Sequence, residues 1–133
     1  MKAINEFTEA LAALSDKTRL RIVYLLVLSG ESICVCEIVD SLEEPEANIS
    51  RHLKILKHAG LVEERKEGRW KYYSITKNGD QFMTHLFQTV SSIPKEMLMK
   101  EYEKLGERLK LRENGRCLLG IQNAQLISRK KGG

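Results

Sequence analysis

The chain has 133 residues, a formal net charge of +4 and a sequence pI near 9.0. This length suits one domain with its own core, and hydrophobic residues make up 42% of it. No apolar run approaches the roughly 20 residues of a membrane span and no signal peptide is recognisable, so we expect a cytoplasmic protein without membrane contact. Its three cysteines, an odd number, favour free thiols over a disulfide framework.

The N-terminal part of the chain predicts two amphipathic helices. The first places its apolar side chains on one stripe at helical spacing: Ile4, Phe7, Leu11 and Leu14. Ser15 and Asp16 offer N-cap oxygens to the second helix. Ser29-Gly30 ends that helix, because glycine accepts the left-handed conformation that follows a helix.

Two shorter helices with a tight turn between them come next. The third covers about Cys34 to Leu42, and Glu43-Glu44-Pro45 is the turn, with Pro45 at the first position of the fourth helix. Ala59-Gly60 closes this fourth helix. Its buried edge is expected to consist of Ile49, Leu53 and Leu56.

The periodicity then changes from helical to alternating. Residues 61–66 and 70–75 predict two strands around the turn Glu67-Gly68-Arg69, which makes a β-hairpin. Thr76 is expected to cap a fifth helix. The apolar residues of that helix are Phe82, Met83, Leu86, Phe87 and Val90.

A sixth helix is predicted to begin at Pro94. Its apolar residues alternate spacings of four and three, a coiled-coil-like seam that requires a partner: Leu98, Tyr102, Leu105 and Leu109. Helical order ends at about residue 111, after which Glu113-Asn114-Gly115 predicts a turn and residues 128–133 a basic tail. We therefore predict a domain at 1–111 and a C-terminal tail at 112–133 that carries Cys117.

Two short helices joined by a turn and followed by a basic hairpin are typical of a winged helix-turn-helix protein. The expected fold class is thus mainly α with a β-hairpin wing, and the expected partner is double-stranded operator DNA. Polar side chains would reach base edges while cations neutralise phosphates. The predicted DNA-binding residues are Asn48, Ser50, Arg51, His52, Lys54, Arg65, Lys66, Arg69 and Lys71. The competing interpretation makes the wing cations ordinary surface and His52 a half-buried helix residue.

Four stretches in this order resemble the ArsR/SmtB family of metal-responsive repressors, over about residues 3 to 90. They are Asp16-Lys17-Thr18-Arg19-Leu20-Arg21-Ile22, Ile49-Ser50-Arg51-His52-Leu53-Lys54-Ile55-Leu56, Ala59-Gly60-Leu61-Val62 and Gly68-Arg69-Trp70-Lys71-Tyr72-Tyr73. The resemblance implies a homodimer, built largely from the first and last helices, that represses operons for metal export or detoxification. One departure is Glu46, where arsenic-responsive relatives often carry glutamine; an acid there should weaken phosphate contact or shift base preference.

Cys34 and Cys36 lie at the start of the third predicted helix. Residues two apart on an ideal helix lie about 200° apart, so both can face one ion only if Cys34 precedes the first turn or the turn unwinds. A helix N-terminus is expected to lower a thiol pKa and favour the thiolate that metals require.

In arsenic- and antimony-responsive members of the family, this cysteine pair binds the metalloid and a third thiolate completes the site. The nearby third position falls on the apolar Val39 here, or on its neighbours Ile38 or Asp40, and none of these is a cysteine; we therefore propose Cys34, Cys36 and Cys117 as the metal ligands. Three sulfurs suit As(III) or Sb(III) better than a four-ligand Cd(II) or Zn(II) site. Cys117 folding back from the same subunit or from its partner, and Cys117 as an incidental cysteine, all stay open. Asp80 and His85 alone do not support the family's other site of acids and histidines on the last helix.

The leading hypothesis is a repressor of a metal(loid)-resistance operon that leaves its operator when As(III) or Sb(III) binds. The alternative keeps the DNA-binding fold but senses Cd(II), Pb(II) or thiol oxidation, or uses no small effector. An enzyme is not expected and no catalytic cofactor is predicted, because a thiol reductase needs Cys-x-x-Cys or an arginine six residues after a cysteine, where this chain has Asp40, Leu42 and Asn123. A protein-interaction module on the last helix would leave the basic wing unexplained.

Overall fold

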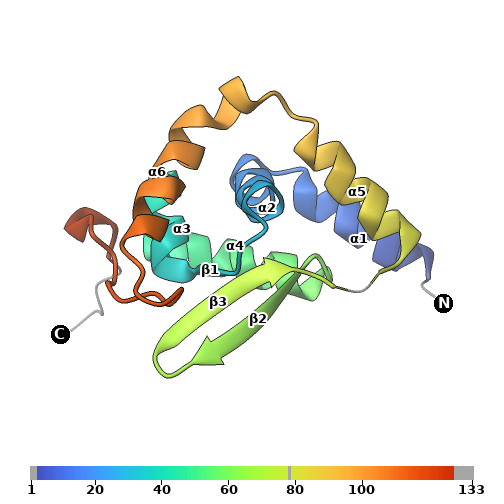
Figure 1. Cartoon of the computed structure of the whole chain (residues 1–133). Coiled ribbons are helices and arrows are strands. Elements are labelled where there is room, and N and C mark those ends of the chain that lie inside the picture. Colours follow the sequence, from blue (N-terminus) through green and yellow to red (C-terminus); the bar gives the residue numbers. More distant parts are fainter. Residues whose placement is uncertain (1–2, 78, 128–133) are drawn as a thin grey trace.

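The computed structural model describes residues 3–77 and 79–127 (Figure 1). The elements are α1 (Ile4–Leu14), α2 (Lys17–Ser29), β1 (Ile33–Cys34), α3 (Val35–Leu42), α4 (Glu46–His58), β2 (Val62–Glu67), β3 (Trp70–Ile75), α5 (Gln81–Ser91), the 3-10 turn η1 (Lys95–Leu98), α6 (Met99–Lys110) and the 3-10 turn η2 (Ala124–Leu126). The predicted fold class, mainly helical with a β-hairpin, is confirmed. Among the described residues, none of the helices combines the length and apolar character that a membrane span requires.

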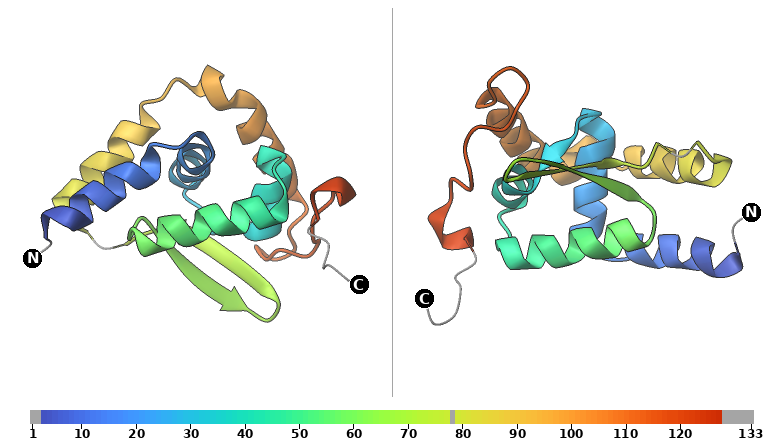
Figure 2. Two further views of the ribbon diagram at one scale, coloured as in Figure 1. Left: turned by 180° about the vertical axis from the view of Figure 1, so that it is seen from behind. Right: turned by 90° about the horizontal axis from the view of Figure 1, so that it is seen from below.

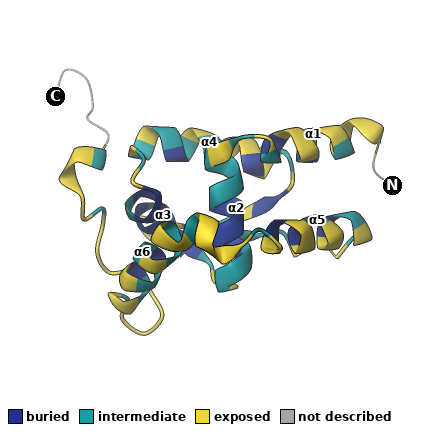
Figure 3. Cartoon of the chain, turned by 90° about the horizontal axis from the view of Figure 1, so that it is seen from above, coloured by how far each residue is buried: buried dark blue, intermediate teal, exposed yellow. Residues whose placement is uncertain are grey.

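Helix α2 runs through the centre of the molecule, and the other helices surround it (Figures 1 and 3). Its start is the predicted one: the Asp16 side chain accepts a hydrogen bond from the backbone N–H of Arg19. Its end is also the predicted one, because Gly30 has a φ of +65° and its N–H donates to the carbonyl of Leu26. The buried residues of α2 are Ile22, Val23, Tyr24, Leu25 and Leu26.

Helices α3 and α4 form the helix-turn-helix. Glu43 ends α3 in the left-handed conformation, with a φ of +56°. Pro45 is the N-cap of α4, so the helix begins at Glu46, one residue later than predicted. The carbonyl of Pro45 already accepts the first helical hydrogen bonds. The predicted buried edge of α4 is confirmed in full, since its three residues are wholly inaccessible: Ile49, Leu53 and Leu56.

A three-stranded antiparallel sheet in the order β1-β3-β2 provides the wing. Strands β2 and β3 pair from Val62 opposite Ile75 to Glu67 opposite Trp70, so Gly68 and Arg69 alone make the turn. Gly68 has a φ of +58°, which a side chain would strain. The short strand β1 pairs with the other edge of β3, which brings Cys34 opposite Tyr72 and so joins the cysteine pair to the wing.

Two expectations for the outer helices are wrong. Helix α1 buries Ala10 and Ala13, whereas Ile4 and Leu11 of the predicted stripe are 75% and 49% exposed. The other two residues of the stripe are half-buried: Leu14 packs against the core and Phe7 lies beside the Phe82 ring. Helix α5 begins later than expected, after Asp80, whose side chain accepts from the N–H of Met83.

Helix α6 packs on α3, so the expected coiled-coil seam is covered within the chain. Leu105 is 1% exposed, and the other seam residues are partly buried against the same core. After α6 the chain reverses at the predicted turn, where Asn114 and Gly115 have φ values of +53° and +73°. The following segment returns along α3 and ends near the start of α4 (Figure 2). The predicted basic tail at 128–133 lies outside the described residues.

Candidate metal centre and nucleic-acid interface

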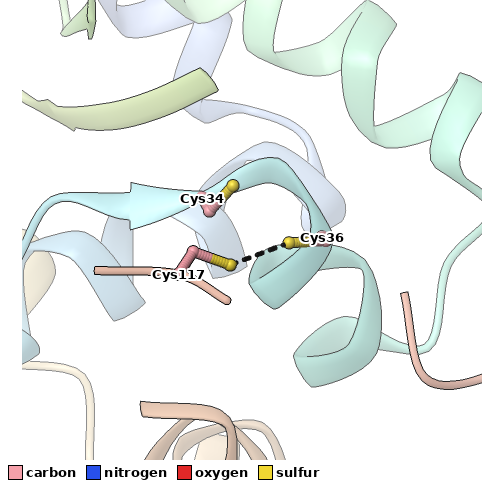
Figure 4. Close-up of side chains that lie close together, drawn as sticks. All are labelled: Cys34, Cys36 and Cys117. Carbon is pink, nitrogen blue, oxygen red and sulfur yellow. Dashed lines mark hydrogen bonds between the residues drawn. The ribbon is translucent and has the colours of Figure 1, made fainter. Parts of the chain in front are cut away.

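The sulfur atoms of Cys34, Cys36 and Cys117 lie within 4.8 Å of one another (Figure 4). The Cys36 and Cys117 sulfurs are 3.3 Å apart, and all three side chains are buried. Cys34 is the extended N-cap residue of α3, with φ −75° and ψ 149°, and Cys36 lies in the first helical turn. Because Cys34 precedes the first turn, two cysteines two residues apart point to the same side. The structure therefore has the first of the two predicted geometries, with Cys117 from the same chain.

The backbone around the thiols is held by hydrogen bonds to buried side chains. The N–H of Cys34 donates to Glu37 Oε1 at 2.9 Å, and the N–H of Cys117 donates to the Tyr72 hydroxyl at 2.8 Å. Arg112 donates to both carboxylate oxygens of Glu37, at 2.8 and 2.7 Å. These hydrogen bonds connect β1, α3, β3 and the chain beyond α6, so four segments of the chain hold the backbone around the thiols in place.

A second arginine, Arg108 of α6, lies against the sulfurs. Arg108 Nη2 is 3.4 Å from Cys36 Sγ and 3.9 Å from Cys117 Sγ, and it donates to the carbonyl of Leu119 at 2.8 Å. Arg108 Nε lies 3.1 Å from Asp40 Oδ2, an ion-pair distance without hydrogen-bond alignment. Asp40 also accepts from the N–H groups of Gln122 and Asn123. The carboxylate thus balances the cation and holds the segment that carries the third thiol.

The expected depression of thiol pKa at the helix N-terminus is wrong for Cys36. Its hydrogen bond with the Cys34 thiol and then its burial raise the pKa of Cys36 far above the usual range. Burial and the neighbouring Cys36 thiol raise the pKa of Cys117 to about 12. Loss of water and crowding of like groups outweigh the helix dipole here. Both thiols are therefore protonated at neutral pH, and an incoming ion must displace their protons.

The predicted DNA-binding residues occupy one helix face and the wing. Those that are exposed are Arg51, Lys54, Arg65, Lys66, Arg69 and Lys71; Asn48, Ser50 and His52 are half-buried. Arg69 stacks over the Trp70 ring with its guanidinium carbon 4.6 Å from the ring centroid, which fixes a cation at the tip of the hairpin.

His52 is already engaged inside the protein. Its Nδ1 accepts from Arg19 Nη1 at 3.1 Å and lies 3.8 Å from Asp16 Oδ2, both at the start of α2. The half-buried interpretation therefore describes this ring correctly. Because Nδ1 is engaged by Arg19, only Nε2 of His52 is left for the predicted base contact.

The thiols and the DNA-binding surface meet in one cavity of about 670 Å³. Its lining includes Cys34 and Cys36, Ser50 of α4, and the wing residues Lys66, Arg69, Trp70 and Lys71. Gly120, Ile121 and Ile127 of the returning segment form another wall. An ion at the sulfurs would thus lie beside the surface predicted to approach DNA.

Four charged residues around the thiols were not anticipated from sequence: Glu37, Asp40, Arg108 and Arg112. One signal was available for Arg108, because it lies in α6 next to the apolar positions Leu105 and Leu109. Arg112 follows four residues later, just beyond the end of α6. Charged residues on an apolar stripe indicate partners across an interface. The identity of those partners on α3 depends on how the two helices cross.

The arrangement of helices, turn and hairpin defines a winged helix-turn-helix protein. Residues 16–64 match the family model described as "Bacterial regulatory protein, arsR family". The chain is 48% identical over 75 residues to an uncharacterised HTH-type transcriptional regulator of Methanocaldococcus jannaschii, covering 56% of this chain and 83% of that one. It belongs to the arsR family of bacterial regulatory proteins.

Two further relatives carry names that specify a metal. An arsenic resistance transcriptional regulator of Pseudomonas putida is 35% identical over 94 residues, covering 71% of this chain and 73% of its own length. A homologue of the cadmium resistance regulatory protein CadC from Staphylococcus aureus is 48% identical over 63 residues, covering 47% and 51%. The fold is shared with HlyU from Vibrio cholerae, with a TM-score of 0.60 and 23% identity over 71% of this chain and 98% of that one.

Proposed function

We propose that the protein is a homodimeric repressor of a metal(loid)-resistance operon, released from operator DNA when As(III) or Sb(III) binds Cys34, Cys36 and Cys117. The observation that carries this proposal is that all three cysteines of the chain meet at the start of α3, the helix that precedes α4 in the helix-turn-helix. Relatives named for arsenic and for cadmium resistance support a metal-responsive regulator, and they leave the ion to be decided by the site.

The distances between the thiols support three-sulfur coordination. With metal–sulfur bonds of about 2.3 Å, three sulfurs on one ion lie about 4.0 Å apart in a planar site and closer in a pyramidal one. The sulfurs lie within 4.8 Å of one another, so binding requires the widest separation to shorten through side-chain movements. Three sulfurs and a lone pair complete the coordination of trivalent arsenic, whereas zinc in a structural site requires a fourth protein ligand. No other group of three candidate ligand residues is found within residues 3–77 and 79–127.

The DNA-binding part of the proposal rests on α4 and the β2–β3 hairpin. Arg51 and Lys54 are exposed on α4, and the hairpin adds four cations, so a duplex would meet positive charge from both elements. Exposed Ile4 and Leu11 on α1 support a homodimer, because apolar side chains on an outer helix face favour burial against a second copy. The seam of α6 no longer supports it, since α3 covers that face.

Release would follow from linkage. If the metalloid binds more tightly to the DNA-free conformation, operator affinity falls by the same coupling free energy. A coupling of about 3 kcal/mol weakens DNA binding on the order of a hundredfold. Pulling the three sulfurs onto one ion would draw the start of α3 and the 117–127 segment together. Both border the cavity that also contains Ser50 and the wing cations.

Thiol oxidation is a second candidate with its own observation. The Cys36 and Cys117 sulfurs are 3.3 Å apart, so a small movement would bring them to the roughly 2.05 Å of a disulfide. A peroxide would supply the oxidising equivalents: two thiols lose two electrons and two protons, and the peroxide is reduced to water. Cys34 would then be dispensable for the response.

The test is a gel-shift titration of the reduced protein on the DNA upstream of its own gene, with As(III), Sb(III), Cd(II), Pb(II), Zn(II) and hydrogen peroxide in parallel. Release by As(III) and Sb(III) alone supports the proposal. Release by Cd(II) or Pb(II) alone would reassign the effector, and release by peroxide alone would favour the second candidate. If the protein does not bind this DNA at all, the proposal that it represses its own operon is rejected.

Variants separate the two sites. Cys34→Ser, Cys36→Ser and Cys117→Ser should each bind DNA as the wild type does but lose release by As(III). The reciprocal control is Arg51→Ala with Lys54→Ala, which should lose DNA binding and keep As(III) binding. A cysteine variant that loses DNA binding without any metal would contradict the separation.

A further inference from the structure

We propose that Asp40, by neutralising Arg108 beside the sulfurs, keeps the three-thiol site selective for trivalent metalloids over divalent metal ions. This inference rests on the proposed three-thiol site and concerns which ion that site prefers. Arg108 is the cation nearest the sulfurs among the described residues, and Asp40 is the acid that neutralises it. The two residues therefore determine the net charge of the protein groups next to a bound ion.

The charges around the thiols are balanced in pairs. Arg108 is 5% exposed and pairs with Asp40, whose side chain is 10% exposed. Arg112 pairs with Glu37, which is fully buried, and its Nη1 also lies 3.8 Å from the exposed Glu31. Farther out, Lys100 and Lys104 both contact Glu43 at the solvent-exposed end of α3. The buried environment of the sulfurs thus contains two cations and two anions and is neutral overall.

The two classes of ion leave different charges at this site. Arsenous acid, As(OH)₃, reacts with three thiols so that three As–S bonds replace three As–O bonds. Each thiol proton leaves with a hydroxyl group as water, and the product is neutral. A divalent ion such as Cd(II) displaces three protons into solvent, and the resulting three-thiolate complex carries one negative charge. No redox change occurs in either reaction.

A neutral buried environment favours the neutral product, because an isolated charge in a poorly hydrated site is costly. Removing the Asp40 charge leaves Arg108 unbalanced beside the sulfurs and stabilises only the anionic complex. At an effective dielectric constant of about 20, a unit charge about 5 Å away changes the binding constant of a singly charged complex roughly a hundredfold. Solvent screening reduces this effect, so we expect a shift of at least about tenfold.

Asp40→Asn and Arg108→Met are the informative variants. The amide introduced by Asp40→Asn would keep an oxygen to accept the N–H of Gln122, and Asp40 in the Arg108 variant keeps that same bond. Arg108→Met also removes the hydrogen bond to the carbonyl of Leu119, so the segment carrying Cys117 keeps the anchor at Asp40 but loses the one at Arg108. We expect Asp40→Asn to raise the ratio of Cd(II) to As(III) binding constants at least about tenfold, and Arg108→Met to lower it. The double variant restores neutrality and should return near the wild-type ratio.

The measurement is competition between Cd(II) and arsenite on the reduced full chain without DNA, followed by sulfur-to-metal charge-transfer absorbance. Glu43→Gln is the matched control, since it removes the same formal charge at an exposed position and should leave the ratio within about twofold. An unchanged ratio in Asp40→Asn, or a double variant that stays shifted, would overturn the inference. If the wild type binds arsenite through fewer than three sulfurs, the proposed function fails instead, and that outcome is visible before any variant is made.

Discussion

The buried ion pair between Arg112 and Glu37 leads to a quantitative prediction. Glu37 is fully buried, and Arg112 donates to its two carboxylate oxygens from Nε and Nη2. Arg112 Nη2 also donates to the carbonyl of Ser32 at 2.6 Å. In the variant Arg112→Met, the carboxylate keeps the N–H of Cys34 as its one remaining donor among these groups. A buried charge would then lack its counter-ion.

Breaking a buried pair by removing one partner costs about 3–5 kcal/mol. The Arg112 side chain is 10% exposed, so some water can reach the space it leaves, and we expect the lower end, about 3 kcal/mol. Urea denaturation followed by circular dichroism measures this loss. For a slope of roughly 1–3 kcal/mol per molar urea, the midpoint should fall by at least about 1 M.

Two controls decide the interpretation. Arg116→Met removes an exposed cation from the same segment and should change stability by less than about 0.5 kcal/mol. Adding Glu37→Gln to Arg112→Met removes the orphaned charge and should recover at least about 1 kcal/mol. The reasoning would be refuted if Arg112→Met stayed within about 1 kcal/mol of the wild type, because the buried carboxylate would then not depend on its partner.

Three further predictions follow from the site and its surroundings. The pKa of Cys117 is raised from its usual 9.0 to about 12, so the folded state holds a proton that the unfolded state releases above pH 9. Stability should therefore be insensitive to this thiol below pH 9 and decline between pH 9 and 12, more steeply than in Cys117→Ser; parallel denaturation curves at several pH values would contradict the shift. Arg51→Ala and Lys54→Ala should each reduce the slope of log DNA affinity against log salt by about one, while a change in affinity with an unchanged slope would mean that neither side chain contacts phosphate. Tyr73→Phe should cost about 1–2 kcal/mol in thermal unfolding, because the Tyr73 hydroxyl donates to the Glu64 carboxylate; a loss below about 0.3 kcal/mol would show that water replaces that bond without cost.

Local sequence signals predicted an element correctly where residues close in sequence determine its bounds or its buried face. Asp16 and Gly30 set the two ends of α2 through hydrogen bonds made within one turn. The buried edge of α4 followed from apolar spacing, and the wing from alternation around Gly68. In each case the physical reason lies within a few residues of the element itself.

Predictions were weaker where a local pattern had more than one solution. The apolar seam on α6 indicated that another helix covers it. The sequence alone did not distinguish a helix of a second chain from α3, which packs on α6 in the structure. Thr76 and Asp80 are both acceptable caps, and the start of α5 at Gln81 selected Asp80. Thr76 instead donates its hydroxyl to Glu63 at the end of the hairpin.

By itself, the sequence determined the helix-turn-helix, the wing and the Cys34–Cys36 pair at the start of α3, because these depend on spacing and on capping. Only the tertiary structure decided that Cys117 reaches that pair within the same chain, since the turn at Asn114-Gly115 and the packing of α6 on α3 direct the returning segment. It also decided the charge and the protonation of the site. Desolvation and ion pairs depend on which groups lie within a few ångströms in space, and Arg108 is separated from Cys36 by 72 positions in the chain.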